Sequence, residues 1–220
     1  MIGFAGLASI SKEKPVNLTA IALNATLKPS NGESSSTDRM IGLIGDALGK
    51  QGVTLGETIR LADHDIKPGV SSDEGEGDAW PAIRAKIITA DVLVFGTPIW
   101  MGQPSSVAKR VCERMDAFLS ETDEQGRTPA YGKVVIVGVV GNEDGAHHSS
   151  AELFQALNDV GWTVAPQAAC YWVGEAMNKK NFKDLVEVPK VIAETIAMAA
   201  ANAAHLAKAL AAANFPGQPG

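Results

Sequence analysis

Short apolar runs alternate with helix-like patterns five times along the chain, and this alternation constrains the fold more than any other feature. The strand-like runs are 18–23, 53–61, 91–98, 132–142 and 162–173. Strands separated by helices typically form a parallel sheet with helices on both faces, so we predict an α/β, three-layer sandwich. No repeat or composition break divides the pattern. We therefore expect one domain over 18–213, between an N-terminal extension (1–17) and a C-terminal tail (214–220).

Apolar residues at helical spacing predict helices over 38–50, 80–90, 104–119 and 148–160. We expect Ser36 or Thr37 to cap the first helix and Pro104 to lie in the first turn of the third. The Ala-rich stretch 191–215 carries Glu194 and Lys208 among its polar residues. Such a stretch is a poor membrane span, and it favours an amphipathic surface helix.

The charge balance narrows the classes of partner. The net charge is −6 without a basic block, which argues against nucleic acid and against an anionic membrane surface. The apolar N-terminal stretch lacks a positively charged start, so we do not expect a signal peptide and predict a cytoplasmic protein. Cys112 and Cys170 form no CxxC pair and are expected to be buried free thiols.

The first candidate site lies between the first strand and the first helix. Four hydroxyl residues, 34–37, stand directly before the predicted helix N-terminus. A helix N-terminus offers unpaired N–H groups and a positive dipole end, and hydroxyls add donors, so this loop suits a phosphate. A solvated loop with one capping residue is the alternative. The loop has neither a Walker lysine nor a GxGxxG fingerprint, which favours a phosphate monoester over a nucleoside triphosphate.

Two further loops follow the third and fourth strands. "GTPIWMGQPSS" (96–106) offers Trp100 as a flat apolar wall and Gly102 for close backbone approach. "GNEDGAHHSS" (141–150) is polar and glycine-rich and has no aromatic residue. Ligands of such sheets bind at the carboxyl ends of the strands, where these loops meet. The pair His147–His148 lacks a carboxylate at ligand spacing on the following helix, and we expect no metal.

With these loops, the chain resembles the flavodoxin-like NAD(P)H-dependent FMN reductase family over roughly residues 18–200. The matching stretches are "NATLKPS…SSST", "GTPIWMGQPSSVAKRVCERMDAF" and "GNEDGAHHS". The family's first loop reads Gly-Ser-x-Arg or Gly-Ser-Pro-Arg. Here Ala25-Thr26 replaces Gly-Ser, Lys28 replaces Arg, and "SNGE" is an insertion. The sequence leaves open which hydroxyls of this loop bind the phosphate.

The resemblance implies a five-stranded parallel sheet of flavodoxin-like order 2-1-3-4-5, FMN as the cofactor and NAD(P)H as the co-substrate. It also implies a homodimer or homotetramer. The phosphate would lie on the first loop and the isoalloxazine ring between the other two, where the Gly145 and Ala146 amides would meet charge on the reduced ring. No side chain is expected to act as a nucleophile, and no catalytic side chain is assigned. The expected cofactor-binding residues are Thr26, Lys28, Ser34, Ser35, Ser36, Thr37, Pro98, Ile99, Trp100, Met101, Gly102, Gln103, Gly141, Asn142, Glu143, Asp144, Gly145, Ala146 and His147.

The sequence is compatible with two classes of function. One is an oxidoreductase that takes hydride from NAD(P)H and reduces a small-molecule electron acceptor such as a quinone or free flavin. The other is a flavodoxin-type electron carrier, with a non-catalytic flavin-binding protein as a further possibility. A carrier typically encloses its ring between aromatic side chains from both loops. The third loop has no aromatic residue, which favours the reductase.

Overall fold

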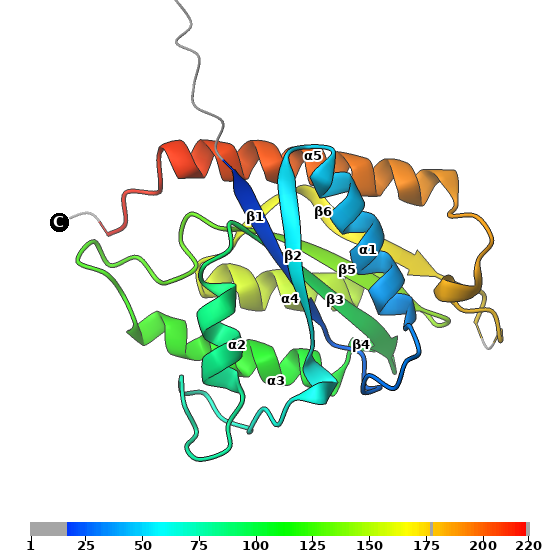
Figure 1. Cartoon of the computed structure of the whole chain (residues 1–220), viewed down its shortest axis with the longest axis horizontal. Helices are drawn as coiled ribbons and strands as arrows, with labels where there is room; N and C mark the ends of the chain where they lie inside the picture. The colour runs from blue at the N-terminus through cyan, green and yellow to red at the C-terminus, as the bar shows by residue number, and fades with distance from the viewer. Residues whose placement is uncertain (1–16, 177, 219–220) are drawn as a thin grey trace, which may run out of the picture.

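The computed structural model describes residues 17–176 and 178–218; the predicted extension 1–17 lies almost entirely outside this range. Parallel strands form one sheet in the order β2-β1-β3-β5-β6, and a short strand, β4, pairs antiparallel with β3 (Figure 1). With β4 set aside, this is the predicted 2-1-3-4-5 order. The strands are β1 (Leu18–Asn24), β2 (Val53–Arg60), β3 (Val92–Trp100), β4 (Gln103–Pro104), β5 (Val134–Gly141) and β6 (Thr163–Val173).

Helices cover both faces of the sheet. Helices α1 and α5 pack on one face, and α2, α3 and α4 pack on the other (Figure 1). Strands β3 and β5 lie at the centre and are buried along almost their whole length, as their unbroken apolar runs predict. The helices are α1 (Ser36–Gly49), α2 (Trp80–Ile87), α3 (Ser106–Met115), α4 (Ala146–Asp159) and α5 (Lys190–Ala212), and three short 3-10 segments are η1 (Leu61–Asp63), η2 (Asp116–Ser120) and η3 (Phe182–Asp184).

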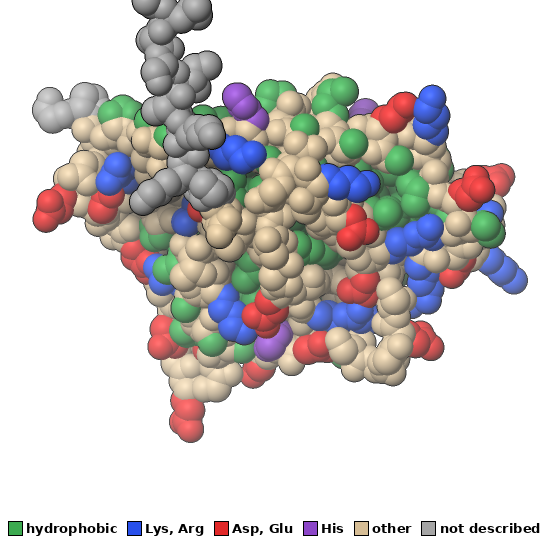
Figure 2. Space-filling view, turned by 45° about the horizontal axis from the view of Figure 1, so that its top comes forward, with side chains coloured by type: hydrophobic (Ala, Val, Ile, Leu, Met, Phe, Trp, Pro, Cys, Tyr) green, Lys and Arg blue, Asp and Glu red, His purple; other side chains and the backbone are tan. Residues whose placement is uncertain are grey.

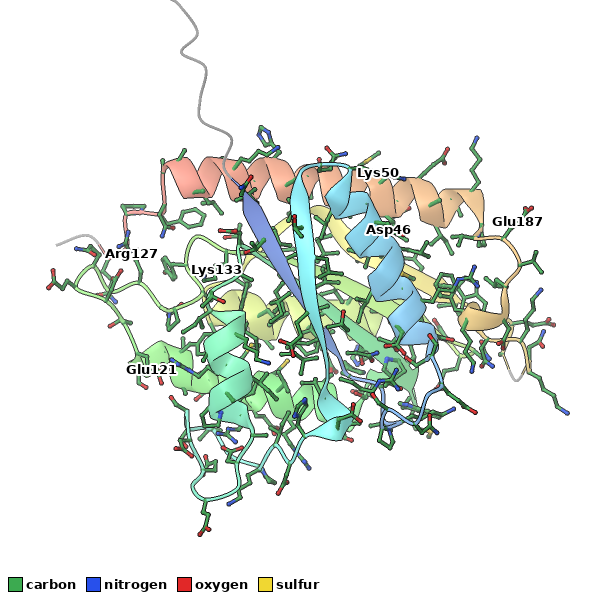
Figure 3. All side chains as sticks on the ribbon, viewed as in Figure 1. Asp46, Lys50, Glu121, Arg127, Lys133 and Glu187 are labelled. Carbon is green, nitrogen blue, oxygen red and sulfur yellow. The ribbon has the colours of Figure 1, made fainter. Side chains whose placement is uncertain are left out.

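Apolar side chains fill the space between the layers, and most charged side chains lie at the periphery. In Figure 3, the labelled residues Asp46, Lys50 and Glu187 lie at the outside of the molecule. Helix α5 buries a row of alanines that includes Ala199, Ala203 and Ala207. Small side chains allow this helix to approach the sheet closely. No helix among the described residues is long and apolar enough to cross a membrane.

Helices α1, α3 and α4 each begin two residues from the predicted position, and the predicted cap of α1 and the predicted place of Pro104 are wrong. Ser35, not Ser36 or Thr37, caps α1, because its hydroxyl accepts the Asp38 N–H while the Asp38 side chain accepts the Ser35 N–H. Such a reciprocal capping box satisfies two N–H groups that the helix leaves unpaired. Pro104 belongs to β4 rather than to a helical turn, and Ser105 caps α3. Here the pairing of β4 with β3 takes precedence over the local preference of proline.

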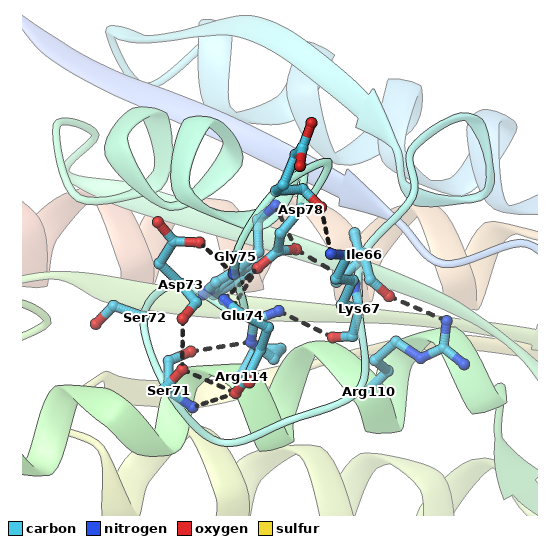
Figure 4. A network of polar contacts seen from close by, with 12 residues as sticks. Ile66, Lys67, Ser71, Ser72, Asp73, Glu74, Gly75, Asp78, Arg110 and Arg114 are labelled. Carbon is cyan, nitrogen blue, oxygen red and sulfur yellow. Dashed lines mark hydrogen bonds and ion pairs between the residues drawn. The ribbon is translucent and has the colours of Figure 1, made fainter.

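The loop after η1, residues 64–79, folds around a buried ion pair; we call it the acidic loop (Figure 4). Arg114 Nη2 lies 2.7 Å from Asp78 Oδ2, and both side chains are fully buried. The other guanidinium nitrogens donate to the carbonyl oxygens of Ser71 and Lys67, each at 2.9 Å. A buried guanidinium needs such partners for each of its nitrogens, so this network fixes the shape of the loop.

Candidate functional site

A cavity of about 440 Å³ opens at the carboxyl ends of the strands. This volume falls within the range of small-molecule sites, roughly 300–1,000 Å³. Its walls come from the loops after β1, β3 and β5, from the end of β2, and from the segment between β6 and α5. The lining residues are Thr26, Leu27, Lys28, Asn31, Glu33, Ser34, Ser35, Ser36, Thr37, Arg60, Pro98, Ile99, Trp100, Val140, Gly141, Asn142, Glu143, Trp172, Asn181 and Lys183.

The hydroxyl-rich loop forms one end of the cavity. Its four hydroxyl residues, 34–37, all line the cavity where α1 begins. Thr37 is almost completely buried yet still lines the cavity. The N-terminus of α1 and four hydroxyl residues therefore border the same space, and a helix N-terminus in such a position suits an anion.

Buried polar groups hold this loop in place. Asn24, at the end of β1, donates to Asp38 Oδ1 at 2.5 Å and accepts the Thr26 N–H at 2.9 Å. Asp38 also pairs with Arg60. Arg60 reaches it because Asn24 and Arg60 are register partners in the β1–β2 pairing. The first loop and the helix N-terminus are thereby fixed to the ends of two strands.

Ser105 connects the first and second loops through hydrogen bonds. Its hydroxyl donates to Ala25 O at 2.6 Å, and its N–H donates to Thr97 Oγ1 at 3.1 Å. Ser105 is fully buried. A buried hydroxyl with both partners satisfied contributes to a rigid, well-defined structure, so the two walls keep a fixed spacing.

The second wall is a hairpin between β3 and β4. Trp100 lines the cavity with 52% of its surface exposed. Met101 (φ 53°) and Gly102 (φ 75°) make the tight turn that follows, as two-residue hairpins require. The Met101 N–H donates to Glu143 Oε1 at 3.0 Å. An exposed Trp on a tight hairpin forms a flat apolar surface at the edge of the cavity.

The third wall is the loop after β5, of which Gly141, Asn142 and Glu143 line the cavity. Gly145 has a φ of 125°, and a Cβ atom there would lie 2.6 Å from Gly102 Cα, so the second and third loops touch at two glycines. The Gly145 N–H donates to Asp144 Oδ1 at 2.7 Å. That amide, predicted to face the ring, is engaged within its own loop.

The two adjacent histidines point to different partners. His147 Nε2 lies 3.1 Å from Tyr171 Oη, and His148 Nε2 lies 2.8 Å from Glu152 Oε1. Glu152 stands four residues after His148 on α4, so the sequence interpretation that no carboxylate follows the pair at such a spacing is wrong. Within 17–176 and 178–218, no group of three or more His, Cys, Asp or Glu residues is placed to hold a metal ion.

The structure brings most of the predicted cofactor-binding residues together. Those that line the cavity are Thr26, Lys28, Ser34, Ser35, Ser36, Thr37, Pro98, Ile99, Trp100, Gly141, Asn142 and Glu143. The remaining predicted residues lie beside the cavity on the same two loops but are not part of its lining: Met101, Gly102, Gln103, Asp144, Gly145, Ala146 and His147.

Other lining residues were not predicted as site residues. They are Leu27, Asn31, Glu33, Arg60, Val140, Trp172, Asn181 and Lys183. Arg60 could have been identified from its position, because it lies at the carboxyl end of β2, the strand that pairs with β1. The segment that carries Asn181 and Lys183 has no periodic pattern, and only the three-dimensional structure places it here.

A family profile described as NADPH-dependent FMN reductase matches residues 20–176. This chain belongs to that family. The expectation of an FMN-dependent oxidoreductase family that uses NAD(P)H is thereby confirmed, as is the flavodoxin-like fold.

Two curated relatives show the range of proteins that contain such a domain. One, named 8-demethyl-8-aminoriboflavin-5'-phosphate synthase, from Streptomyces davaonensis, is 34% identical over 171 residues. The other, named divalent metal cation transporter MntH, from Mycobacterium bovis, is 40% identical over 171 residues. The matches cover 72% and 76% of this chain, but only 65% and 25% of the relatives' own lengths.

Solved structures agree with the fold. RosB, with bound 8-demethyl-8-formylriboflavin-5'-phosphate, has a TM-score of 0.80 at 30% identity, covering 90% of this chain and 82% of that one. A WrbA-like flavodoxin protein from Agrobacterium tumefaciens has a TM-score of 0.56 at 16% identity, covering 88% of this chain and 99% of that one. The second similarity concerns the fold alone.

Proposed function

We propose that this chain binds FMN in the cavity, takes hydride from NAD(P)H and reduces a small acceptor such as a quinone or free flavin. The observation that carries the proposal is the juxtaposition of a hydroxyl-lined helix N-terminus with the exposed face of Trp100 in one cavity. A phosphate suits the first feature and a flat aromatic ring suits the second. The family match supports both assignments.

In this proposal, the residues of the protein bind the FMN and orient its ring. Ser34 to Thr37 and the first N–H groups of α1 hold the phosphate, and Trp100 packs on the ring. FMN, when bound, supplies the hydride and electron chemistry. Asn24, Asp38 and Arg60 keep the phosphate-binding end rigid, which lowers the entropic cost of binding. No nucleophilic side chain is required.

The reductase is favoured over a flavodoxin-type carrier because Trp100 covers one side of the cavity, while Gly141, Asn142 and Glu143 offer no aromatic cover. Trp172 also lines the cavity, but its ring packs on Phe182 with centroids 5.5 Å apart. This contact holds Trp172 against the segment before α5. One side of a ring bound here therefore stays open to a nicotinamide.

The test is to load the purified protein with FMN and mix it anaerobically with NADH or NADPH in a stopped-flow spectrometer. We expect rapid two-electron bleaching of the flavin absorbance. An absence of bleaching with both nucleotides, together with a stable one-electron-reduced flavin on photoreduction, would identify a carrier. Extraction of the bound flavin checks the cofactor, and FAD as the dominant species would contradict the proposal.

A second candidate has its own support. The synthase relative and RosB both take their names or titles from 8-substituted riboflavin-5'-phosphates, and riboflavin-5'-phosphate is FMN. In this alternative the flavin is a substrate, modified at its 8-position, rather than a resident cofactor. Mass spectrometry of the flavin after incubation with cell extract distinguishes the two: a reductase returns FMN of unchanged mass.

A cytoplasmic location, a homodimer or homotetramer, and a domain over residues 18–213 remain predictions. Sedimentation of the purified chain measures the oligomeric state. Limited proteolysis measures the extent of the domain.

A further inference from the structure

We infer that residues 178–185 form a fourth wall of the cavity, in which Lys183 binds the phosphate of the ligand and Arg39 acts as the positioning residue. We call these residues the strap. The inference rests on the proposed function because it assumes that the ligand is a flavin with a phosphate. None of the strap residues was among the predicted cofactor-binding residues.

The strap spans the cavity from one end to the other. At the hydroxyl end, the Lys183 N–H donates to Ser36 Oγ at 3.2 Å. At the opposite end, Asn142 Nδ2 donates to Asn178 O at 3.1 Å and to Asn181 Oδ1 at 3.3 Å. Asn181 and Lys183 both line the cavity. The strap thus connects the first loop to the third above the strand ends.

Arg39, in the first turns of α1, holds the strap in this position. Its Nη1 donates to the carbonyl oxygens of Phe182, Lys183 and Leu185, at 2.8, 3.1 and 2.6 Å. Its guanidinium carbon lies 5.3 Å from the centre of the Phe182 ring, within the range of a cation–π contact. Nη1 has two N–H hydrogens, so the three carbonyl oxygens share them, while the guanidinium group lies over the Phe182 ring.

Phe182 anchors the strap to the core. It is fully buried and packs against Trp172. Asp184 closes the turn around it by accepting the Asn181 N–H and side-chain amide at 3.2 and 2.9 Å. Arg39 does not line the cavity itself and borders only a shallow hollow beside it. Its effect on a ligand therefore passes through the strap, which makes it a positioning residue rather than a binding residue.

Lys183 brings a positive charge to the end of the cavity where the hydroxyls gather. Its backbone N–H donates to Ser36, and the residue lines both the cavity and a shallow hollow beside Ser34. The hollow is also lined by Glu33, Asp38, Arg39 and Asp184. Figure 2 shows Lys and Arg side chains interspersed with Asp and Glu side chains on the side of the molecule where α1 begins and the segment before α5 passes. A lysine at this place recognises a phosphate and has no partner in an unphosphorylated flavin.

The test compares the affinities of FMN and riboflavin, which differ only in the phosphate. We expect Lys183→Ala to weaken FMN binding about fivefold, as is typical of a solvent-accessible charge pair, and to leave riboflavin binding unchanged. Lys180→Ala is the matched control, because Lys180 is an exposed lysine on the same strap outside the cavity lining. The effect of Lys183→Ala should shrink as the salt concentration is raised.

Arg39→Ala should lower the FMN-to-riboflavin affinity ratio by a similar factor, and the double variant with Lys183→Ala should add little. If Arg39→Ala fails to fold, Arg39→Lys with hydrogen exchange on the strap replaces it; faster exchange there, with a lower affinity ratio, supports the inference. A wild-type chain that binds neither flavin overturns the proposed function. A wild type that binds FMN, with an unchanged ratio in Lys183→Ala, overturns this inference alone.

Discussion

The hydroxyl-rich loop before α1 and the acidic loop before α2 are both polar, but their surroundings differ. Both follow a strand at the same edge of the sheet, and both lead into a helix. In the acidic loop, Asp78 accepts hydrogen bonds from Lys67 N, Glu74 N, Trp80 N and Arg114 (Figure 4). In the hydroxyl loop, residues 34–37 line a cavity. The acidic loop encloses a buried ion pair, whereas the hydroxyl loop lines a cavity. Polar composition alone therefore does not distinguish a loop that packs on itself from one that borders a possible ligand site.

The largest expected effect is on stability, at the acidic loop. Arg114→Met leaves Asp78 buried without its partner, and removal of one member of a buried pair costs about 3–5 kcal/mol. We expect urea denaturation to show a loss of this size and FMN affinity of the folded protein to stay unchanged. Lys86→Ala, which breaks an exposed pair with Glu57, is the control, with an expected cost below about 1 kcal/mol. Equal losses in both variants would contradict the comparison.

The next effect is on binding, at the hydroxyl loop. Replacing Ser35 and Thr37 together by Ala should weaken FMN binding by about two decades or more, because each hydrogen bond to a charged group contributes about 1.5–3 kcal/mol. Replacing Ser71 and Ser72 by Ala should leave the affinity unchanged, since both hydroxyls bond carboxylates within or beside the acidic loop. Isothermal titration measures both.

Loss of the Ser35 cap complicates this measurement, because a cap contributes about 1 kcal/mol to stability. The folded fraction should therefore be checked by circular dichroism at each titration temperature. Equal FMN affinities in the wild type and in the folded Ser35/Thr37 double variant would show that the phosphate lies elsewhere.

Lowering the pH should reduce the stability that the acidic loop contributes more than the stability that the hydroxyl loop contributes. Burial raises the pKa of Asp78, but hydrogen bonds from Arg114 and from three N–H groups outweigh it and hold the pKa well below its usual range. A depressed folded-state pKa stabilises the fold above the unfolded pKa, near 3.9, and this stability is lost as pH falls below it. We expect the free energy of unfolding to fall by up to about 1.4 kcal/mol per pH unit below about pH 4 from this group.

Asp63, which anchors the hydroxyl loop, is the control for that titration. Hydrogen bonds from the Ser30 side chain and N–H lower the pKa of Asp63 as well, but the carboxylate is solvent-exposed. Asp63→Asn should leave the acid limb of the stability curve almost unchanged, whereas Arg114→Met should flatten it. Urea denaturation at pH 7, 5, 4 and 3 measures both; a larger change in Asp63→Asn would contradict the assignment.

The smallest expected effect concerns Trp100. Aromatic contacts contribute about 0.5–1.5 kcal/mol beyond the area that they bury, so Trp100→Leu should weaken FMN and riboflavin equally, by about three- to tenfold. Leu119→Ala is the control, because Leu119 is as exposed as Trp100 and lies outside the cavity lining. A loss confined to FMN would place Trp100 near the phosphate instead of the ring.

The strands and helices could be predicted from the sequence because each of them is specified by a local pattern of residues. The unbroken apolar runs of β3 and β5 and the helical spacing in α1 specify each element, and the family resemblance supplies the strand order. β4 was missed, since two residues carry no periodicity. Ser35 was passed over as the cap because its neighbours Ser36 and Thr37 have the same chemistry, and only the Asp38 contact distinguishes it.

The candidate site was predictable where its residues follow strands directly and less so where long-range contacts place them. Lys28, Ser34 and Trp100 follow β1 and β3 and line the cavity as expected. Lys183 and Asn181 reach it because Arg39 holds their segment across more than 140 positions of sequence. Contacts between residues so far apart in the chain produce no pattern that can be recognised in a single sequence.

The contact between Gly102 and Gly145 has a consequence for protein engineering. A side chain at position 145 would collide with backbone atoms of residue 102, and both glycines have positive φ angles. Loop libraries over residues 98–104 and 141–147 should therefore keep glycine at position 145, where any side chain would meet the backbone of residue 102, and should also keep glycine at position 102, where φ is positive. With these two positions fixed, the contact between the loops does not restrict the other positions.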